Sequence, residues 1–346
     1  MSAARTNGLI DRRYSDKVHK LILAVAALAA IIYAGLLPTI WIWPEFGLRF
    51  LWFLVIPLAP MVLLAAPNVW VSICPISTFQ TLGRKLGWKG GKRLSPEVSA
   101  KLQTFGWALM FVGIPTRHLW FNTIGWATAS VAIAITLVAV GAGLFYFTLS
   151  GWCVGACPIR PIEVLYGQFA RERNRPEMCR ICDACVPHCI RLRPEKADGE
   201  LTRLPLALHL TFGFPGFVAA YFLLDLLYYC NVEHVFFGTS TDAPAHMGIH
   251  ALTVYGGMAA GFFVTFLLFH GLRAIGVNKK TLILSAAIAA YSFYYLGVVP
   301  EIVEAWALSS ALGWAILAVP AIVLGTVLFV PGTTRRRLTP LKVKNS

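Results

Sequence analysis

Charged residues are scarce in this chain, since Asp, Glu, Lys and Arg together make up 13% of its 346 residues. A soluble domain carries about 25% charged residues, so this composition excludes an ordinary soluble protein and indicates a membrane protein. Acidic residues are the scarcer sign, which leaves a net charge of +14. The basic residues lie between apolar runs rather than on one domain, and this distribution argues against nucleic-acid binding.

Three further absences narrow the range of functions. No G-x-G-x-x-G sequence follows a strand, so nothing resembles a nucleotide or flavin site. The chain also lacks a long Gly/Ser linker and any low-complexity tract. Its eight cysteines fall short of the density of a disulfide scaffold. Most of them lie in cofactor-type motifs, which favours thiolates that act as ligands.

Eight apolar segments are long enough to cross the hydrocarbon core of a bilayer, which takes about 20 helical residues. They lie at 21–43, 50–67, 102–121, 124–150, 205–229, 249–272, 281–299 and 306–330. We therefore expect an all-α polytopic membrane protein with about eight transmembrane helices. The apolar runs show no matching helix breaks or charge pairs at the midplane, so a transporter is not favoured.

The connections between these segments differ sharply in their content of Lys and Arg. Of the 30 basic residues, 28 fall on one side of the predicted membrane, and only Arg49 and Arg117 fall opposite. The positive-inside rule then places both termini and the loop 151–204 in the cytoplasm of a bacterial cell, with the spans in the inner membrane. The basic arm before the first span indicates a signal anchor rather than a cleaved signal peptide.

An internal repeat organises the first half of the chain. The segment PNVWVSICPISTFQTLGRK (67–85) aligns with SGWCVGACPIRPIEVLYGQ (150–168), so that Cys74 matches Cys157, 83 residues later. The first copy has Trp70 where the second has Cys153. The predicted organisation is a cytoplasmic arm 1–20, duplicated two-span units 21–150, a cytoplasmic cluster loop 151–204, a four-span bundle 205–330 and a basic cytoplasmic tail 331–346.

Four cysteines stand within the loop 151–204 at the spacing C-x2-C-x2-C-x3-C. They are Cys179, Cys182, Cys185 and Cys189. This is the spacing of a ferredoxin loop, in which the first three cysteines hold one [4Fe–4S] cluster and the fourth serves a neighbouring cluster. Here Ile190, rather than proline, follows the fourth cysteine. A zinc knuckle, or four free thiols, are the alternatives.

The other cysteines on the same side raise the question of a second cluster. Cys74 or Cys157 could complete the first cluster, and the remaining one could join Cys153 and Cys189 in a second. Seven cysteines fall one short of the eight that two cubanes need. His188 or a [3Fe–4S] species would close that gap.

Six arginines surround the run of cysteines. They are Arg171, Arg173, Arg175, Arg180, Arg191 and Arg193. Positive-inside topology and contact with lipid phosphates explain most of them. The alternative is that they dock a soluble acidic electron carrier, such as a ferredoxin or flavodoxin, or raise the potential of the cluster.

The combination of Cys74-Pro75, GWCVGACPI and the Cys179 run resembles the NapH/NosR-type membrane iron–sulfur proteins, to which the FixG/CcoG-type, polyferredoxin-like proteins are related. The similarity covers residues 21–193. It implies electron transfer between the quinone pool and an acceptor, often in support of a respiratory reductase. Members of the family commonly carry two complete ferredoxin runs, whereas this chain has one and lacks the first cysteine of its first C-x3-C-P.

Histidines in the second half offer further candidate ligands. His209 and His270 are expected at similar depth near the cytoplasmic surface, where they could jointly ligate a haem. The plainer interpretation is two amphipathic side chains at an interface.

The outer connection between the fifth and sixth spans gathers Cys230, His234, His246 and His250 without any Lys or Arg. If helical, each i, i+4 pair places two side chains on one face. These residues could bind a transition metal or haem, or accept protons from a quinol with Glu301. A polar outer loop is the remaining interpretation.

The sequence as a whole predicts a membrane-bound electron-transfer protein that relays electrons between a quinol or haem and a redox partner through a cytoplasmic [4Fe–4S] cluster. No residue resembles a catalytic acid or base, so a subunit of a respiratory or redox complex fits better than a self-contained enzyme. The alternative is an assembly factor that reduces a metal, or delivers one, to a membrane or periplasmic oxidoreductase.

Overall fold

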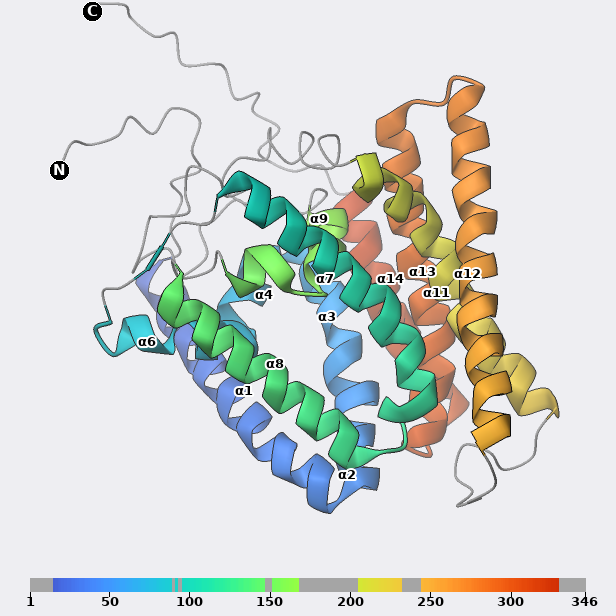
Figure 1. The fold of residues 1–346 in the computed structure, drawn as a ribbon. Helices are drawn as coiled ribbons and strands as arrows, with labels where there is room; N and C mark the ends of the chain where they lie inside the picture. Colours follow the sequence, from blue (N-terminus) through green and yellow to red (C-terminus); the bar gives the residue numbers. More distant parts are fainter. Residues whose placement is uncertain are drawn as a thin grey trace, which may run out of the picture.

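The computed structural model describes residues 15–88, 91–92, 95–146, 151–167, 205–231 and 244–329. These residues are almost entirely helical, and the one β-bridge described among them joins Lys92 and Tyr146. The helices, shown in Figure 1, are α1 (Asp16–Ile42), α2 (Pro44–Phe50), η1 (Leu51–Val55), α3 (Ile56–Ala65), α4 (Pro67–Ile73), α5 (Pro75–Gln80), α6 (Leu82–Lys85), α7 (Pro96–Thr116), η2 (Arg117–Phe121), α8 (Gly125–Phe145), η3 (Trp152–Ala156), α9 (Arg160–Gly167), α11 (Pro205–Asn231), α12 (Pro244–Ala274), α13 (Lys279–Ala305) and α14 (Ser310–Phe329).

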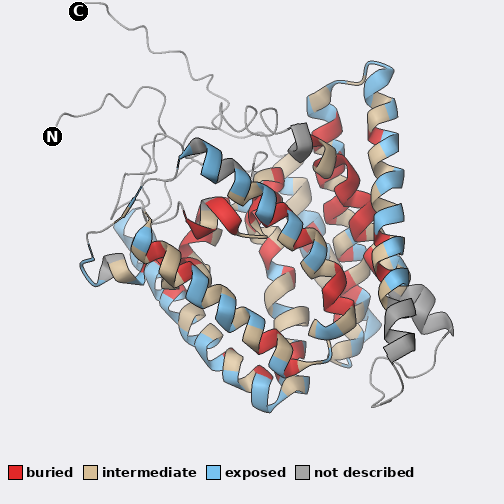
Figure 2. Cartoon of the chain, viewed as in Figure 1, coloured by how far each residue is buried: buried red, intermediate tan, exposed pale blue. Residues whose placement is uncertain are grey.

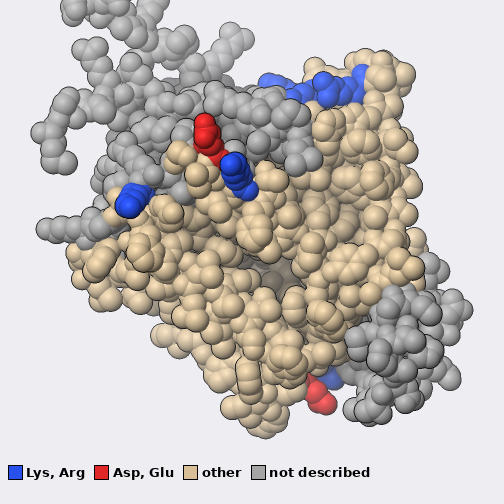
Figure 3. Space-filling view, viewed as in Figure 1, with Lys and Arg blue, Asp and Glu red and all other residues tan. Residues whose placement is uncertain are grey.

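Six helical stretches of the described chain are long and apolar enough to cross a membrane. They are Asp16–Ile42, Pro44–Ala65, Gly125–Phe145, Ala251–Ala274, Lys279–Ala305 and Ser310–Phe329. Helices α7 and α11 occupy the two remaining predicted spans, with Leu208–Leu224 as the apolar part of α11. On the face drawn in Figure 3, charged side chains lie toward the two ends, with an uncharged band between them. The chain is an all-α, multi-pass membrane protein.

Two of the spans contain a π-helical turn beside a proline. Turn η1 ends two residues before Pro57, and turn η2 begins two residues after Pro115. Proline has no N–H group, so the carbonyl four residues earlier loses its helical partner. A wider i→i−5 turn is one way for the chain to remain helical past such a point.

The second half is held together by close packing of α11 on α12. Gly216 lies against the backbone carbonyl of Gly261, which forms a G-x-x-x-G sequence with Gly257. Small residues at this spacing let two helix backbones approach closely within a membrane. Thr265 reinforces the contact, since its Oγ1 accepts from the Gly216 N–H at 3.1 Å and donates to the Gly213 carbonyl at 3.1 Å.

The largest buried cluster lies mainly on α11 and α13, with additions from α12, α3, α7 and α9. Figure 2 shows these buried residues inside a shell of exposed ones, and α12 turns a long exposed face outward. Exposed apolar residues on α12 such as Phe263, Leu267 and Leu268 are expected of a helix that faces lipid.

In the first half, the two repeats pack on one another in a reciprocal manner. Helix α5 of the first copy packs on α8, and helix α9 of the second copy packs on α3. Each turn also contacts the first helix of its own copy, α4 on α1 and η3 on α7. The turns therefore gather at one end of the bundle, here called the cysteine end. The other end, called the opposite end, carries η2 and the connection from α13 to α14.

Candidate functional site

The candidate site is formed by the two Cys-Pro turns at the cysteine end. Cys74 ends α4 with φ −59° and ψ 123°, and Cys157 ends η3 with φ −64° and ψ 123°. Each of these cysteines precedes a proline, which disfavours the α-helical conformation for the residue before it. The sequence thus breaks the helix at the cysteine in both copies, and the two turns have the same backbone conformation there.

Backbone N–H groups lie near Cys157. The amides of Ile159 and Arg160 at the start of α9 lower the pKa of the Cys157 thiol, and the Arg160 N–H donates to the Cys157 carbonyl at 3.1 Å. Gly106 of α7 lies against the Cys157 carbonyl, where an added Cβ would come within 3.1 Å of the oxygen. Hydrogen bonds to sulfur are among the features that set the potential of an iron–sulfur cluster.

The two Cys-Pro cysteines lie close enough to interact electrostatically. Burial, followed by the nearby Cys74, raises the pKa of the Cys157 thiol, and the Ile159 amide offsets part of this rise, so that the pKa is about 12. A thiol with this pKa stays protonated at neutral pH in the metal-free chain. A bound cation reverses that preference, because the thiolate is the form that binds metals.

Cys153 connects the second copy to the first. Its Sγ donates to Oε1 of Gln80 at 2.8 Å, across 73 residues of sequence. Gln80 is only 1% exposed. Cys153 also packs against Val71. Trp70, which matches Cys153 in the repeat, packs against the same residue.

A buried ion pair stands next to the turn of the second copy. Arg160 Nη1 lies 2.9 Å from Glu163 Oε1, and the two side chains are 6% and 7% exposed. The sequence offered Arg160 only as one of many basic residues on the cytoplasmic side. An Arg and an acid three residues apart on an amphipathic helix are the signal that could have revealed the pair.

Three of the predicted cluster ligands lie among the described residues. Cys74 and Cys157 are within electrostatic range of one another, and Cys153 packs against Val71 of α4, but no group of three His, Cys, Asp or Glu side chains in the described ranges is arranged to hold a metal ion. The predicted ligands Cys179, Cys182, Cys185 and Cys189, with His188, lie outside the described residues. The run begins 12 residues after Gly167, and an extended chain of that length reaches about 40 Å. These features fit two or three thiolate ligands, with the rest drawn from the run.

The structure brings His209 and His270 together. Nδ1 of His209 lies 2.7 Å from Nε2 of His270, and the two rings stack with centroids 4.7 Å apart. An iron between two imidazoles holds their nitrogens about 4 Å apart, twice a metal–imidazole distance of about 2 Å. In this structure the rings instead bond one another directly. Their role as haem ligands stays a prediction.

The outer-side candidates fall largely outside what is described. Cys230 lies in α11 and His246 and His250 lie in α12, but their side chains are not among the described ones, and His234 lies in an undescribed segment. The proposed metal, haem or proton chemistry of this group stays a prediction.

A polar cluster at the opposite end was not anticipated as a unit. Nη2 of Arg117 lies 4.0 Å from Oε2 of Glu301. The guanidinium carbon of Arg117 lies 4.4 Å from the centroid of the Trp52 ring and 5.4 Å from the centroid of the Tyr221 ring. Its Nε donates to Oδ1 of Asn122 at 2.7 Å. This network ties η2 to η1, α11 and α13. The isolated Arg-His pair in an apolar run was its sequence signal.

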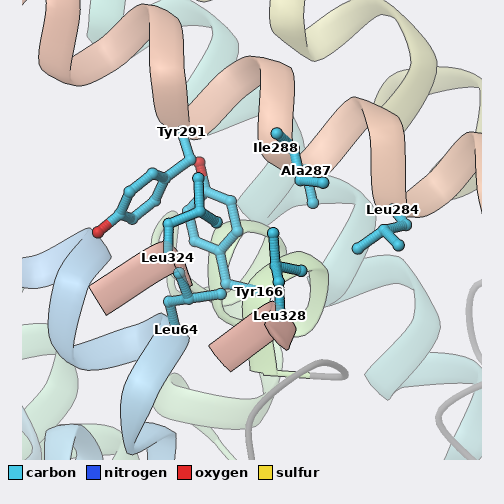
Figure 4. Close-up of a pocket in the computed structure, with 8 residues that line it drawn as sticks. All are labelled: Leu64, Tyr166, Leu284, Ala287, Ile288, Tyr291, Leu324 and Leu328. Atoms are coloured by element: carbon cyan, nitrogen blue, oxygen red, sulfur yellow. The ribbon is translucent and has the colours of Figure 1, made fainter. Parts of the chain in front are cut away.

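A small apolar hollow lies beside α9. Figure 4 shows Tyr166 and Tyr291 among its lining residues, which are Leu64, Tyr166, Leu284, Ala287, Ile288, Tyr291, Leu324 and Leu328. The two tyrosine rings meet edge to face at 5.8 Å between centroids, and the Tyr291 hydroxyl donates to the Pro320 carbonyl at 3.2 Å.

Comparisons of the chain with protein-family models, with curated proteins and with solved structures give no match. The chemistry of the site must therefore be argued from its own residues.

Proposed function

We propose that this chain is a membrane-bound electron-transfer protein, which relays electrons between a quinol or haem in the membrane and a redox partner through a [4Fe–4S] cluster on the cytoplasmic side. The observation that carries the proposal is the convergence of Cys74 and Cys157 from two like turns at one end of the bundle. The ferredoxin-spaced run follows that end directly in the sequence. A structural or transport protein has no use for this arrangement of thiols.

In this proposal, Cys179, Cys182 and Cys185 hold one cluster, with Cys157 or Cys74 as the fourth ligand. The cluster supplies one-electron transfer. The chain supplies thiolate ligands and the protein that excludes water around them. The Arg160–Glu163 pair stabilises the first turn of α9, which follows Cys157.

The surroundings of the site support a membrane circuit. The basic connections favour a cytoplasmic cysteine end with both termini on that side of the inner membrane. Six helical stretches of the described chain are long and apolar enough to cross a membrane, which would give the chain access to donors within the bilayer. We further propose that the chain works as a subunit with other redox proteins, as in the NapH/NosR-type systems that it resembles.

The direct test is anaerobic purification of the full chain, followed by iron and acid-labile sulfide counts, EPR of the dithionite-reduced protein and a pyridine haemochrome assay. About four iron atoms per chain without haem supports one cubane. Seven or eight non-haem iron atoms bring in a second cluster, and a haem signal gives His209 and His270 a ligand role. A chain that binds zinc and no iron overturns the proposal.

A pair of variants sharpens this test. Cys182→Ser removes a predicted ligand and should abolish the EPR signal and most of the iron. Cys230→Ser changes a cysteine outside the proposed cluster site and should leave both unchanged. Equal iron content in the two variants would contradict the assignment of the run as the cluster site.

A further inference from the structure

Polar side chains line one face of α13 from its middle to the opposite end, and the proposed function leaves them unused. They are Tyr291, Tyr294, Tyr295 and Glu301, which lie within about a third of the helix circumference. Tyr291 is the thirteenth of the 27 residues of α13, and Glu301 lies about 15 Å farther along the helix. Ionisable side chains inside a membrane bundle are costly, and they commonly mark the paths of protons or ions.

The tyrosines of this face contact one another in series. Tyr166 of α9 meets Tyr291 edge to face at 5.8 Å between centroids, and both residues are labelled in Figure 4. The Tyr291 ring lies 4.7 Å from Tyr295, whose ring lies 5.1 Å from Tyr294. All four side chains are within electrostatic range of one another. A hydroxyl group both donates and accepts, and its hydrogen rotates to suit, so such a row can pass a proton along.

The hydroxyl of Tyr294 differs from its two neighbours on α13. The Tyr291 hydroxyl donates to the Pro320 carbonyl at 3.2 Å, and the Tyr295 hydroxyl donates to the Pro57 carbonyl at 2.6 Å. The Tyr294 hydroxyl is buried as well, but it has no hydrogen-bond partner among the residues that the structure describes. A buried hydroxyl needs a partner, so we expect an internal water molecule at this point.

The row of tyrosines ends at an ion pair. Nη2 of Arg117 and Oε2 of Glu301 lie 4.0 Å apart, and the two side chains are 9% and 22% exposed. Tyr294 is within electrostatic range of both. Glu304, one turn later on α13, is exposed. Glu301 therefore stands between a buried hydroxyl and an exposed carboxylate, which is the position of a group that exchanges protons with water.

Two π-helical turns build the surroundings of this pair. Turn η2 carries Arg117 and His118, and turn η1 carries Trp52, whose indole N–H donates to the Phe121 carbonyl of η2 at 2.9 Å. The His118 ring packs on Tyr221 of α11 with centroids 3.9 Å apart, and Tyr221 also lies under the Arg117 guanidinium. π-Helical turns occur frequently at functional sites. The arginine is held firmly enough to compensate the charge of the carboxylate each time the carboxylate loses its proton.

We infer that Glu301 is the group through which this chain releases protons at the opposite end, with the tyrosine hydroxyls of α13 as the inner part of the path. The inference rests on the proposed function, because oxidation of a quinol yields two electrons and two protons, and an electron relay carries only the electrons. Each proton forms an O–H bond with the Glu301 carboxylate and leaves to water when that bond breaks. With the cysteine end in the cytoplasm, the protons emerge outside the cell.

The experiment uses the full-length, anaerobically prepared protein in liposomes that contain decylubiquinol, with pyranine trapped inside and ferricyanide added outside. Ferricyanide does not cross the bilayer, so it takes electrons only from chains whose cysteine end faces outward. Their protons should therefore acidify the vesicle interior. Glu301→Gln should slow this acidification about a hundredfold, as expected for the loss of a proton-transfer group. Tyr294→Phe should slow it less, about tenfold, because water can bridge part of the gap.

Two further variants serve as controls for this assay. Glu301→Asp keeps a carboxyl group and should recover most of the rate. Glu45→Gln should match the unmodified protein, because Glu45 is an exposed carboxylate on α2, outside the cluster of polar residues.

An infrared titration adds a measurement that needs neither a cluster nor turnover. The spectrum of the unmodified chain should show a carboxyl band that appears on acidification near neutral pH, persists in Glu45→Gln and is missing in Glu301→Gln. Equal acidification rates in Glu301→Gln and the unmodified protein, or a Glu301 carboxylate that stays ionised throughout this range, would overturn the inference and leave the proposed function standing. A chain that oxidises no quinol and holds no cluster would overturn both.

Discussion

The contact between α5 and α8 can be tested by placing a single methyl group in it. Gly143→Ala puts a Cβ onto the backbone carbonyl of Gln80, whereas Gly141→Ala, two residues earlier on the same helix, meets nothing within 4 Å. Both changes gain the same helix propensity, about 1 kcal/mol relative to glycine. The difference between them therefore isolates the cost of the clash.

The magnitude of that cost follows from the nature of the contact. Overpacking of a protein interior costs about 1–3 kcal/mol, and the upper end applies here because a helix backbone cannot move aside as a flexible side chain can. At about 2.1 cal/mol/K of unfolding entropy per residue, 1 kcal/mol shifts the Tm of this chain of 346 residues by about 1.4 °C. Gly143→Ala should therefore melt roughly 4 °C below Gly141→Ala.

The assay is thermal unfolding followed by tryptophan fluorescence in detergent, with the alkylation rate of Cys153 at a temperature below both transitions as a second readout. A shifted α5 should loosen the Gln80 contact and expose Cys153 in Gly143→Ala only. Equal Tm values and equal alkylation rates in the two variants would show that α5 does not pack on α8 in this way.

Other expected outcomes follow from single contacts in the structure. Tyr295→Phe removes a 2.6 Å hydrogen bond to the Pro57 carbonyl and should cost about 1 kcal/mol in thermal unfolding. Arg117→Lys loses the planar stack over Trp52 and should lower Tm by several degrees, because an ammonium group cannot replace a stacked guanidinium; an unchanged Tm would contradict this. In the metal-free chain, the alkylation rate of Cys157 should rise tenfold per pH unit up to about pH 12, without a plateau near 9. Stability should fall over the same range, because the unfolded thiol loses its proton near pH 9.0 while the folded one keeps it to about 12.

Much of the fold could be predicted from the sequence because bilayer-spanning helices need long apolar runs. The residues at which each helix begins and ends were harder to predict. The second span was expected from residue 50, but the helix begins at Pro44 and includes Glu45 and Arg49. Hydropathy excludes these charged residues, whereas the backbone continues through them because proline favours the first turn of a helix.

The local conformation of the candidate site could also be predicted, but its long-range contacts could not. Cys74-Pro and Cys157-Pro predict a helix break from the chemistry of the next residue alone. The bond between Cys153 and Gln80 depends on how α5 packs against α8 and spans 73 residues. The network around Arg117 could not be predicted for the same reason, because it joins segments that are distant in the sequence and meet only in the folded bundle.

The asymmetry between the two repeats has a physical logic. Trp70 and Cys153, which match one another in the two copies, both pack against Val71. An acid at 163 would oppose a thiolate near it, and Glu163 already raises the pKa of Cys157. Its pairing with Arg160 limits that repulsion. The two copies therefore differ in two linked positions, with a tryptophan opposite one cysteine and an ion-paired glutamate opposite one amide.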